Sequence, residues 1–393
     1  MTASVARDIA RSALVLACLA VSSRATAQQN TAGPAPAGQN PHTPQNTQAD
    51  QAARDAQSEY PSLHLSGFAD VDFAAQDKSE GPRGFSEGQF VLHLASALSP
   101  RVNFFGEVSL TPRADAGTSS SGSPPATGFN TEVERVIIRF DHSDRLKISF
   151  GRYHTPINWW NTAFHHGQWL QTTVSRPEMI QFGGRFLPVH FVGALAEGAF
   201  QAGGWNLNYQ AGIGNGRGNV ISRAGDAGDN NARPAVVLNV FTKPDSVFGL
   251  QVGGSVYVDR VSVPGRPEFD ERIIAAHAVW QREDPELIAE IADVRHEPVA
   301  GGQTTSNLGY YVQTAYRLPS PAHLWKPYYR FEHLAVDAAD PVFVGVPNLN
   351  GSTLGVRFDI STYAAIKSEI RSRRRVSDQA RTNGWFVQIC FTF

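Results

Sequence analysis

Cysteine is scarce in this 393-residue chain, which contains only Cys18 and Cys390. Cys18 lies in the apolar stretch 13–21, which follows two arginines and precedes the small residues of 25–27. This arrangement is typical of a secretory signal peptide, which we predict over residues 1–27. Cys390 then stands alone in the mature chain, which excludes an internal disulfide and a cysteine-based metal site. Lipidation of Cys18 is the alternative, although the apolar stretch before it is short.

Long apolar stretches and an excess of one charge are also lacking. After the signal, no stretch of about 18 uncharged apolar residues occurs, which excludes a membrane-spanning helix. The net charge is −2, and the signal carries three arginines and one aspartate (+2), so the mature chain carries −4. Nucleic-acid-binding proteins have a basic footprint, which is absent here, and we expect no nucleic-acid partner.

Large apolar side chains are missing from residues 28–59, which contain no large aliphatic or aromatic residue. Such a segment cannot bury enough apolar surface to offset the entropy of ordering it. We predict a disordered periplasmic leader over 28–60. A cell-wall-binding role has no motif to support it.

From Leu63 onward the chain repeats one unit, about ten residues of alternating polarity followed by a turn. The last unit is typical, because Trp385, Val387, Ile389, Phe391 and Phe393 share one parity and polar or small residues lie between them. Period-2 alternation indicates strands with one apolar face. An exposed terminal strand of this kind would aggregate in water, but in a membrane barrel it pairs with the first strand and faces lipid.

The connections between these units alternate between short turns and long polar loops. The alternation holds if 153–187 is a single loop, and it breaks if 179–186 is a strand of the wall. Outer-membrane barrels have short periplasmic turns and longer outer loops, and single-chain bacterial barrels have an even number of strands. We therefore predict an all-β, transmembrane antiparallel barrel of about sixteen strands over 61–393.

Four tryptophans lie near predicted strand ends on the lipid-facing parity: Trp205, Trp280, Trp325 and Trp385. Indole rings favour the interface between hydrocarbon and water, so we interpret these residues as a membrane girdle. Scattered surface tryptophans are the alternative. The aromatic ending, Phe391 and Phe393, resembles the insertion signal of bacterial outer-membrane proteins. That resemblance implies the barrel-assembly machinery and outer-membrane lipid as partners.

Charged residues occupy many positions of the inward parity. The basic ones are Arg101, Arg135, Arg139, Arg145, Lys147, Arg317, Lys326, Arg330, Arg357, Lys367, Arg371 and Arg373, and the acidic ones are Asp70, Asp72, Glu107, Glu332, Asp359 and Glu369. This tally gives twice as many basic as acidic residues. A lumen with excess positive charge attracts anions, whereas paired charges would only keep the pore wet.

The predicted third outer loop is rich in aromatic residues. We expect Trp159, Trp160, His165 and Trp169 to line a constriction, because so many rings would be costly in water and the barrel interior is the nearest surface. Arg135, Arg139, Arg145 and Lys147 would face the lumen beside the origin of this loop, and Arg371 and Arg373 would extend positive potential toward the outer mouth.

Two short motifs carry a family resemblance. Gly151-Arg152-x-x-x-Pro156 ends the fifth strand and Asn215-Gly216-Arg217 follows the seventh. Together with the strand pattern, they resemble the bacterial outer-membrane porin superfamily, which includes phosphate-selective channels. The resemblance implies an infolded third loop, passive diffusion of small hydrophilic solutes and a homotrimer. One departure is that this loop has a single acid, Glu178, where general porins have several.

Metal and enzyme chemistry are the remaining classes. Adjacent residues of an extended chain point to opposite sides, so His165 and His166 are not expected to share an ion, and with His154 we favour polar packing over a metal site. No Gly-x-Ser-x-Gly motif occurs, although His64 and His93 face inward beside Ser66. We expect neither enzyme activity nor a cofactor. The sequence predicts a porin in the bacterial outer membrane that prefers anions. The alternatives are a channel selective for sugars or aromatic solutes, a barrel hydrolase and an adhesin.

Overall fold

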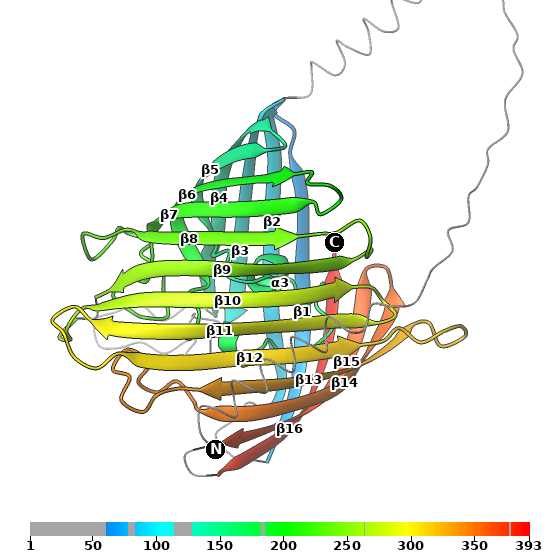
Figure 1. The fold of residues 1–393 in the computed structure, drawn as a ribbon. Helices are drawn as coiled ribbons and strands as arrows, with labels where there is room; N and C mark the ends of the chain where they lie inside the picture. The colour runs from blue at the N-terminus through cyan, green and yellow to red at the C-terminus, as the bar shows by residue number, and fades with distance from the viewer. Residues whose placement is uncertain (1–59, 78–82, 114–127, 182–184, 263, 377–378) are drawn as a thin grey trace, which may run out of the picture. The chain divides into compact units, whose positions relative to one another are not determined.

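A closed barrel of sixteen antiparallel strands makes up the described part of the chain (Figure 1). The computed structural model describes residues 60–77, 83–113, 128–181, 185–262, 264–376 and 379–393. The predicted signal peptide and leader, apart from Tyr60, lie outside these residues and stay predictions. The prediction of a sixteen-stranded antiparallel barrel is confirmed.

The strands follow one another around the barrel in chain order. Their bounds are β1 (His64–Gln76), β2 (Gly84–Ser99), β3 (Val102–Pro112), β4 (Phe129–Ser143), β5 (Leu146–His154), β6 (His190–Phe200), β7 (Leu207–Asn215), β8 (Ala235–Thr242), β9 (Leu250–Val261), β10 (Phe269–Gln281), β11 (Glu286–Pro298), β12 (Thr305–Ala315), β13 (Trp325–Ala335), β14 (Leu349–Ser361), β15 (Ala364–Arg375) and β16 (Arg381–Thr392). A short helix, α3 (Trp160–Phe164), and a 3-10 turn, η1 (Glu178–Ile180), lie between β5 and β6. Among the described residues, no helix is long and apolar enough to cross a membrane.

The last strand closes the barrel on the first. In the register between β1 and β16, Phe68 lies opposite Thr392 and Val71 opposite Ile389. Beyond the strand, the Phe393 backbone N–H donates to the Gly67 carbonyl oxygen at 3.1 Å and its carbonyl accepts from the Gly67 N–H at 2.9 Å. Closure of this kind pairs the edges that a terminal strand would otherwise expose.

The outer face of the barrel is apolar. Leu354, Ile370 and Ile389 are 46% to 61% exposed, although each lies in the middle of a strand. Their neighbours along the strand, such as Glu369 and Gln388, are buried on the opposite face. Alternation with the apolar side chains outside is the pattern of a barrel whose outer solvent is lipid.

The hydrophobic core lies inside the barrel. It joins buried residues of 155–189, including Ile157, Trp160 and Ile180, with inward side chains of the wall such as Tyr257 and Ile273. Burying a side chain of this size contributes about 2 kcal/mol. The segment 155–189 therefore packs against β8 to β11 as a core, while the two ends of the segment continue from β5 and into β6.

The longest connections lie at one end of the barrel, as predicted, although 316–324 at the other end is longer than 299–304 and 376–380. β4 and β5 are joined by 144–145 and β14 and β15 by 362–363, whereas 155–189 and 216–234 connect strands at the opposite end. We call these the short-turn end and the long-loop end. The residues 179–181 and 185–186 are not a strand of the wall, as the sixteen-strand prediction required. Both bounds of the predicted loop 153–187 were wrong by two residues, because Tyr153 and His154 belong to β5 and β6 begins only at His190.

A β-bulge interrupts β4 where it pairs with β3. Glu107 lies opposite Arg135 and Val108 opposite Val133, so Glu134 is an extra residue. A bulge lets two consecutive side chains face the same side. Val133 and Val136 are exposed to the outside, while Glu134 is buried and Arg135 half-buried. The parity of β4 therefore changes at this point.

Candidate functional site

The segment 155–189, which we call the β5–β6 segment, contacts inward side chains of five strands far from its own ends. Its helix α3 begins where the Trp159 and Trp160 backbone N–H groups donate to Glu290 Oε1 of β11 at 2.8 and 2.7 Å. A carboxylate at this position satisfies two amides that have no partner within the helix and complements the helix dipole. Ser255 of β9 accepts from the Asn158 N–H at 2.9 Å.

A second anchor lies on β13 and β15. Arg330 is fully buried and donates to the backbone oxygens of Ser175 and Arg176 at 2.8 and 3.1 Å. Glu369 accepts from the backbone N–H groups of Val174 and Ser175 at 2.9 and 3.1 Å. These inward charges bond to backbone groups of residues 174–176, which belong to no helix or strand. Buried backbone groups without hydrogen-bond partners would be costly.

A third anchor lies nearer the short-turn end. The Thr172 hydroxyl lies 3.0 Å from Glu286 Oε2 of β11, and Arg357 of β14 donates to the backbone oxygens of Trp169 and Gln171 at 2.6 and 3.1 Å. The Arg357 guanidinium also lies 5.5 Å from the centre of the Trp169 ring. Glu286 and Arg357 thus both have partners in the β5–β6 segment.

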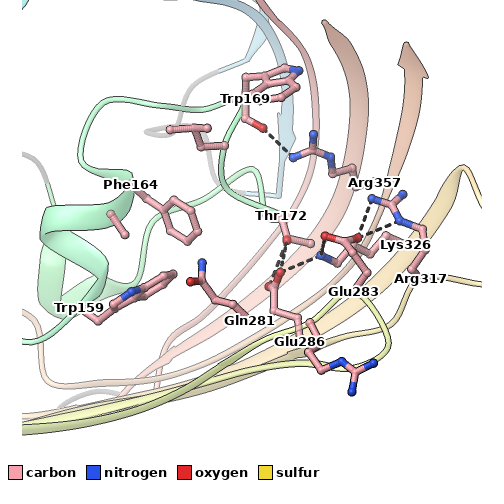
Figure 2. A pocket seen from close by; sticks show the side chains of 13 residues that line it. Trp159, Phe164, Trp169, Thr172, Gln281, Glu283, Glu286, Arg317, Lys326 and Arg357 are labelled. Atoms are coloured by element: carbon pink, nitrogen blue, oxygen red, sulfur yellow. Dashed lines mark hydrogen bonds and ion pairs between the residues drawn. The ribbon is translucent and has the colours of Figure 1, made fainter. Parts of the chain in front are cut away.

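A cavity of about 660 Å³ lies between this segment and the wall at the short-turn end (Figure 2). Trp159, Phe164 and Trp169 form one side of it. The charged residues on the other side are Arg282, Glu283, Glu286, Arg317, Lys326 and Arg357. Four are basic and two acidic, so the charged lining is positive overall. The cavity combines apolar rings with a cationic wall.

The charges around this cavity are paired. Lys326 Nζ lies 3.1 Å from Glu283 and 2.8 Å from Glu286, and Arg317 lies 2.9 Å from Glu283 and 2.6 Å from Asp359. Burial alone would raise the pKa of Glu283, but Lys326 and Arg317 hold it below its usual range. Glu283 therefore stays ionised and neutralises part of the basic lining.

The predicted constriction arginines of β4 and β5 occupy different depths. Arg135 pairs with Glu107 and its guanidinium lies 4.4 Å from the Phe105 ring centre. Arg139 pairs with Asp141 at 2.7 Å and is 3.7 Å from Glu197. Lys147 lies opposite Asp141 in the register, nearer the short-turn end. The β5–β6 segment begins after His154, at the end of β5 that lies away from the turn 144–145. Of these three residues, only Arg135 lies beside that point, because Arg139 and Lys147 lie nearer the turn.

Arg145 and Trp160 do not lie where the constriction was predicted. Arg145 is exposed in the turn 144–145, so it does not line the middle of the lumen. Trp160 is 1% exposed and packs beside Arg176, whose guanidinium lies 4.9 Å from its ring. A ring so deeply buried cannot contact a passing solute. Trp159 and Trp169, in contrast, line the cavity.

Arg371 and Arg373 are not free positive charges. Arg371 lies 2.6 Å from Glu369 and 3.5 Å from the centre of the Phe386 ring, and Arg373 pairs with Glu178. Glu178, the single acid of the segment, thus neutralises a wall arginine. The predicted extension of positive potential toward the long-loop end is weakened by both ion pairs.

The predicted girdle residues face outward. Trp205, Trp325 and Trp385 are 44% to 62% exposed, and Trp280 is half-buried with its Nε1 donating to the Phe248 oxygen at 3.1 Å. Three of them lie at the short-turn end, namely Trp205, Trp280 and Trp325, whereas Trp385 lies near the long-loop end. Phe391 and Phe393 are also exposed, and Phe393 stacks on Phe90 at 5.7 Å between ring centres.

Several buried acids were missed by the sequence analysis. Asp259, Glu271, Glu286 and Glu290 lie buried on β9 to β11, and Glu134 lies at the bulge. The twofold excess of basic residues therefore does not hold. On β10 both faces carry apolar residues, since buried Ile273 and exposed Ile274 are neighbours. The sequence pattern therefore does not show which face of this strand points into the barrel. Glu134 has the outward parity of its strand and only the bulge turns it inward.

A second buried network includes the motif arginine Arg217. Its Nε lies 2.9 Å from Glu271, whose other oxygen is 2.9 Å from His296, and His296 Nδ1 lies 2.7 Å from Asp340. Gly216 leaves no room for a side chain, because the Asp259 carboxylate lies against it and accepts from the Arg217 N–H at 2.9 Å. The motif thus fastens two connections of the long-loop end to the wall.

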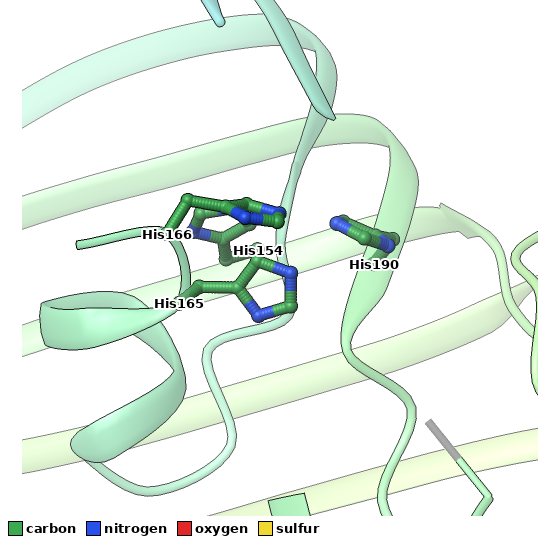
Figure 3. Close-up of side chains that lie close together, drawn as sticks. All are labelled: His154, His165, His166 and His190. Carbon is green, nitrogen blue, oxygen red and sulfur yellow. The ribbon is translucent and has the colours of Figure 1, made fainter. Parts of the chain in front are cut away.

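Four histidines meet on the other side of the barrel (Figure 3). His154, His165, His166 and His190 each offer a ring nitrogen, and these nitrogens lie within 4.8 Å of one another. The expectation that His165 and His166 point to opposite sides was wrong, because they follow helix α3 and their ring centres are 4.4 Å apart. His165 is 3% exposed and so does not line the pore.

The sequence matches no protein-family model and no curated protein. Similarity to solved structures is clear. It includes an anion-selective porin from Comamonas acidovorans, with 14% identity over 85% of this chain and 100% of that one and a TM-score of 0.60. The outer membrane channel DcaP of Acinetobacter baumannii has 10% identity over 86% and 98% of the two chains and a TM-score of 0.55. The trimer form of OmpT, an outer membrane protein of Vibrio cholerae, has 10% identity over 85% and 100% and a TM-score of 0.53. The fold is that of outer-membrane porins.

Proposed function

We propose that this chain is a porin of the bacterial outer membrane through which small hydrophilic solutes diffuse passively. The observation that carries the proposal is the closed sixteen-stranded barrel with its apolar outer face and its many charged and polar inward side chains. A barrel of this size encloses a lumen, and lipid is the solvent that suits its outer face. The similar structures, which include a porin and a channel, support transport rather than catalysis.

The β5–β6 segment narrows the lumen in this proposal. It is bonded to wall residues of β9, β11, β13, β14 and β15, which supports a position across the barrel. The short turns would face the periplasm and the long loops the exterior. The exposed tryptophans near both ends would form the girdle, and Phe391 with Phe393 would be the insertion signal read by the barrel-assembly machinery. A homotrimer is supported by the trimer form of OmpT.

Liposome swelling tests passive passage. Liposomes that contain the folded barrel should swell in arabinose faster than in raffinose, because a narrowed lumen sieves by size. A matched preparation denatured by heat gives the background rate. Equal swelling in both sugars at the background rate would contradict the proposal.

A preference for anions is the finer part of the proposal. It rests on the cavity lining, which holds four basic and two acidic residues, and one similar structure is an anion-selective porin. The cavity should therefore attract anions at the short-turn end. Replacing Arg282 by Gln should lower the anion preference measured from the reversal potential in a KCl gradient, and Arg272→Gln on the exposed face is the control. Cation selectivity of the intact protein would contradict this part.

A channel for aromatic solutes is the second candidate, favoured by the three rings that line the same cavity. Flat rings stack on indole, whereas saturated rings do not gain that contact. Benzoate should then block the conductance more strongly than cyclohexanecarboxylate, and Trp169→Leu should remove the difference. Equal block by both compounds would rule out the aromatic preference.

A further inference from the structure

The four-histidine cluster brings together parts of the chain that the fold makes neighbours. His154 ends β5 and His190 begins β6, and the two residues lie directly opposite each other in the register. His165 and His166 follow helix α3, in the middle of the β5–β6 segment. Figure 3 shows the four imidazole rings in one group. The middle of the segment thus returns to the two strands from which its ends emerge.

A fifth group, the Glu134 carboxylate, faces the cluster from the bulge of β4. Its Oε2 lies 3.0 Å from His166 Nε2 and 2.9 Å from His190 Nε2. Zinc binds imidazole nitrogen and carboxylate oxygen at about 2.1 Å, so two ligands lie about 3.4 Å apart at the tetrahedral angle and about 3.0 Å apart at the right angle that five ligands allow. The two separations therefore match neighbouring ligands of one ion.

The orientation of the His166 ring suits coordination through Nε2. His166 Nδ1 lies 3.3 Å from Gln89 Oε1. Metal-binding histidines commonly donate their other ring N–H to an oxygen in this way, which fixes the ring and the tautomer. Gln89 is thus placed to orient the His166 ring, whereas His165 Nδ1 lies 2.9 Å from both Asn161 Oδ1 and the donating Arg176 guanidinium.

All five groups are withdrawn from solvent. The Glu134 side chain is 4% exposed and the His190 side chain 9%. The facing atoms of these two residues, Glu134 Oε2 and His190 Nε2, are 2.9 Å apart. Burial favours neutral imidazole, the form that binds a metal. A buried carboxylate oxygen beside several imidazole nitrogens is a donor set that suits a transition-metal cation.

Two arginines compete with a cation at this place. Arg152 Nη1 lies 3.5 Å from Glu134 Oε2, and Arg176 Nη2 lies 2.9 Å from His165 Nδ1. A hard cation such as Mg²⁺ would gain one carboxylate here, whereas a transition metal gains several imidazoles.

We propose that His166, His190 and Glu134, together with His154 and His165, bind one transition-metal dication of the zinc class. The ion joins the middle of the β5–β6 segment to β4, β5 and β6, and so acts as a cross-link at the base of the segment. Metal binding does not require that solutes pass, so a barrel without conductance would still bind the ion if the proposal is correct.

Titration of the metal-stripped, detergent-folded full barrel with Co²⁺ tests the proposal. One equivalent per chain should produce visible ligand-field absorption, and Zn²⁺ should abolish it by displacing Co²⁺. His190→Gln and His166→Gln should weaken binding by tenfold or more, and Gln89→Leu by about tenfold through loss of orientation. His277→Gln, which removes a buried inward imidazole elsewhere, is the control and should bind as the wild type does.

Folding of each variant is checked by heat-modifiable migration on a gel. If a histidine variant does not fold, the wild-type titration decides, because absence of a one-to-one Co²⁺ spectrum overturns the proposal. Unchanged affinity in folded His166→Gln and His190→Gln barrels would also overturn it. Loss of binding in His277→Gln alone would place the ion elsewhere and likewise refute the assignment.

Discussion

The β5–β6 segment is attached to the barrel in two different ways. On β9, β11, β13, β14 and β15, side chains bond mostly to its backbone, as Arg330 and Glu369 do at Ser175. On β4, β5 and β6, the contacts join side chains, with Glu134 facing His166 and His190. We call these the far wall and the near wall.

The difference shows what an inward charge can mean. On the far wall, charges satisfy backbone amides and carbonyls that would otherwise be buried without partners. They are part of the structure and are little available to a solute. On the near wall, several imidazole nitrogens and one carboxylate lie within reach of one another, as the ligands of a single ion would. A count of charged residues therefore does not measure selectivity.

The largest effect should come from the far wall. Arg330→Met leaves the backbone oxygens of Ser175 and Arg176 without their buried partner, which should cost about 3–5 kcal/mol of the free energy of unfolding. Urea unfolding in detergent measures it, with the exposed Arg374→Met as control. Conductance should also rise as the segment loosens. A variant as stable as the control would remove the distinction between the two walls.

Zinc should strengthen the near wall. At a free concentration about 100 times the dissociation constant, the ion should raise the free energy of unfolding by about 2.7 kcal/mol. The same addition should stabilise His190→Gln less, by about 1.4 kcal/mol at most if the variant binds tenfold more weakly. Equal stabilisation of both proteins would show that zinc acts elsewhere.

The next effect concerns the helix that crosses between the walls. Glu290→Ala removes the acceptor of the Trp159 and Trp160 amides and should cost about 2 kcal/mol. Hydrogen exchange of these amides should become faster, and Glu290→Gln, which keeps an oxygen, should restore part of the protection. Unchanged exchange in Glu290→Ala would contradict this role.

The smallest effect should be the pH dependence of stability that comes from the connection 336–348 at the long-loop end. This connection is held by buried hydrogen bonds of Asp340 to β11 and β12, as the far wall holds the β5–β6 segment. Burial alone would raise the pKa of Asp340, but hydrogen bonds with His296, Asn307 and Thr305 hold it well below its usual range. The unfolded chain then binds the proton more readily, so stability is present above about pH 4 and is lost as the pH falls further.

Unfolding of the wild type and of Asp340→Asn at several pH values measures this contribution. The wild type should lose on the order of 1 kcal/mol more than the variant between neutral and acidic pH. Parallel stability curves for the two proteins would show that Asp340 does not carry the effect.

The barrel was predictable because lipid and closure impose simple rules. Period-2 alternation and the alternating lengths of the connections gave the sixteen strands, and the final strand indicated closure with the first. The parity rule failed where the local geometry changes. Glu134 is turned inward by a bulge that pairing with β3 creates, and nothing in the sequence marks that extra residue.

The candidate sites depended on contacts between distant parts of the chain. Adjacent histidines were expected to diverge as on a strand, but His165 and His166 follow a short helix whose start is fixed by Glu290, about 130 residues away. The inward acids of β9 to β11 were not recognised in the sequence, because these strands also carry inward apolar residues that pack against the β5–β6 segment. Their roles emerge only when the segment and the wall are seen together.

Single-channel recording tests the central claim most directly. Purified wild-type barrel, shown to be folded by heat-modifiable migration, is added to a planar lipid bilayer at neutral pH. A porin predicts discrete conductance steps of uniform size with a linear dependence of current on voltage. A folded, inserted barrel that carries no current above the bare bilayer would contradict the account.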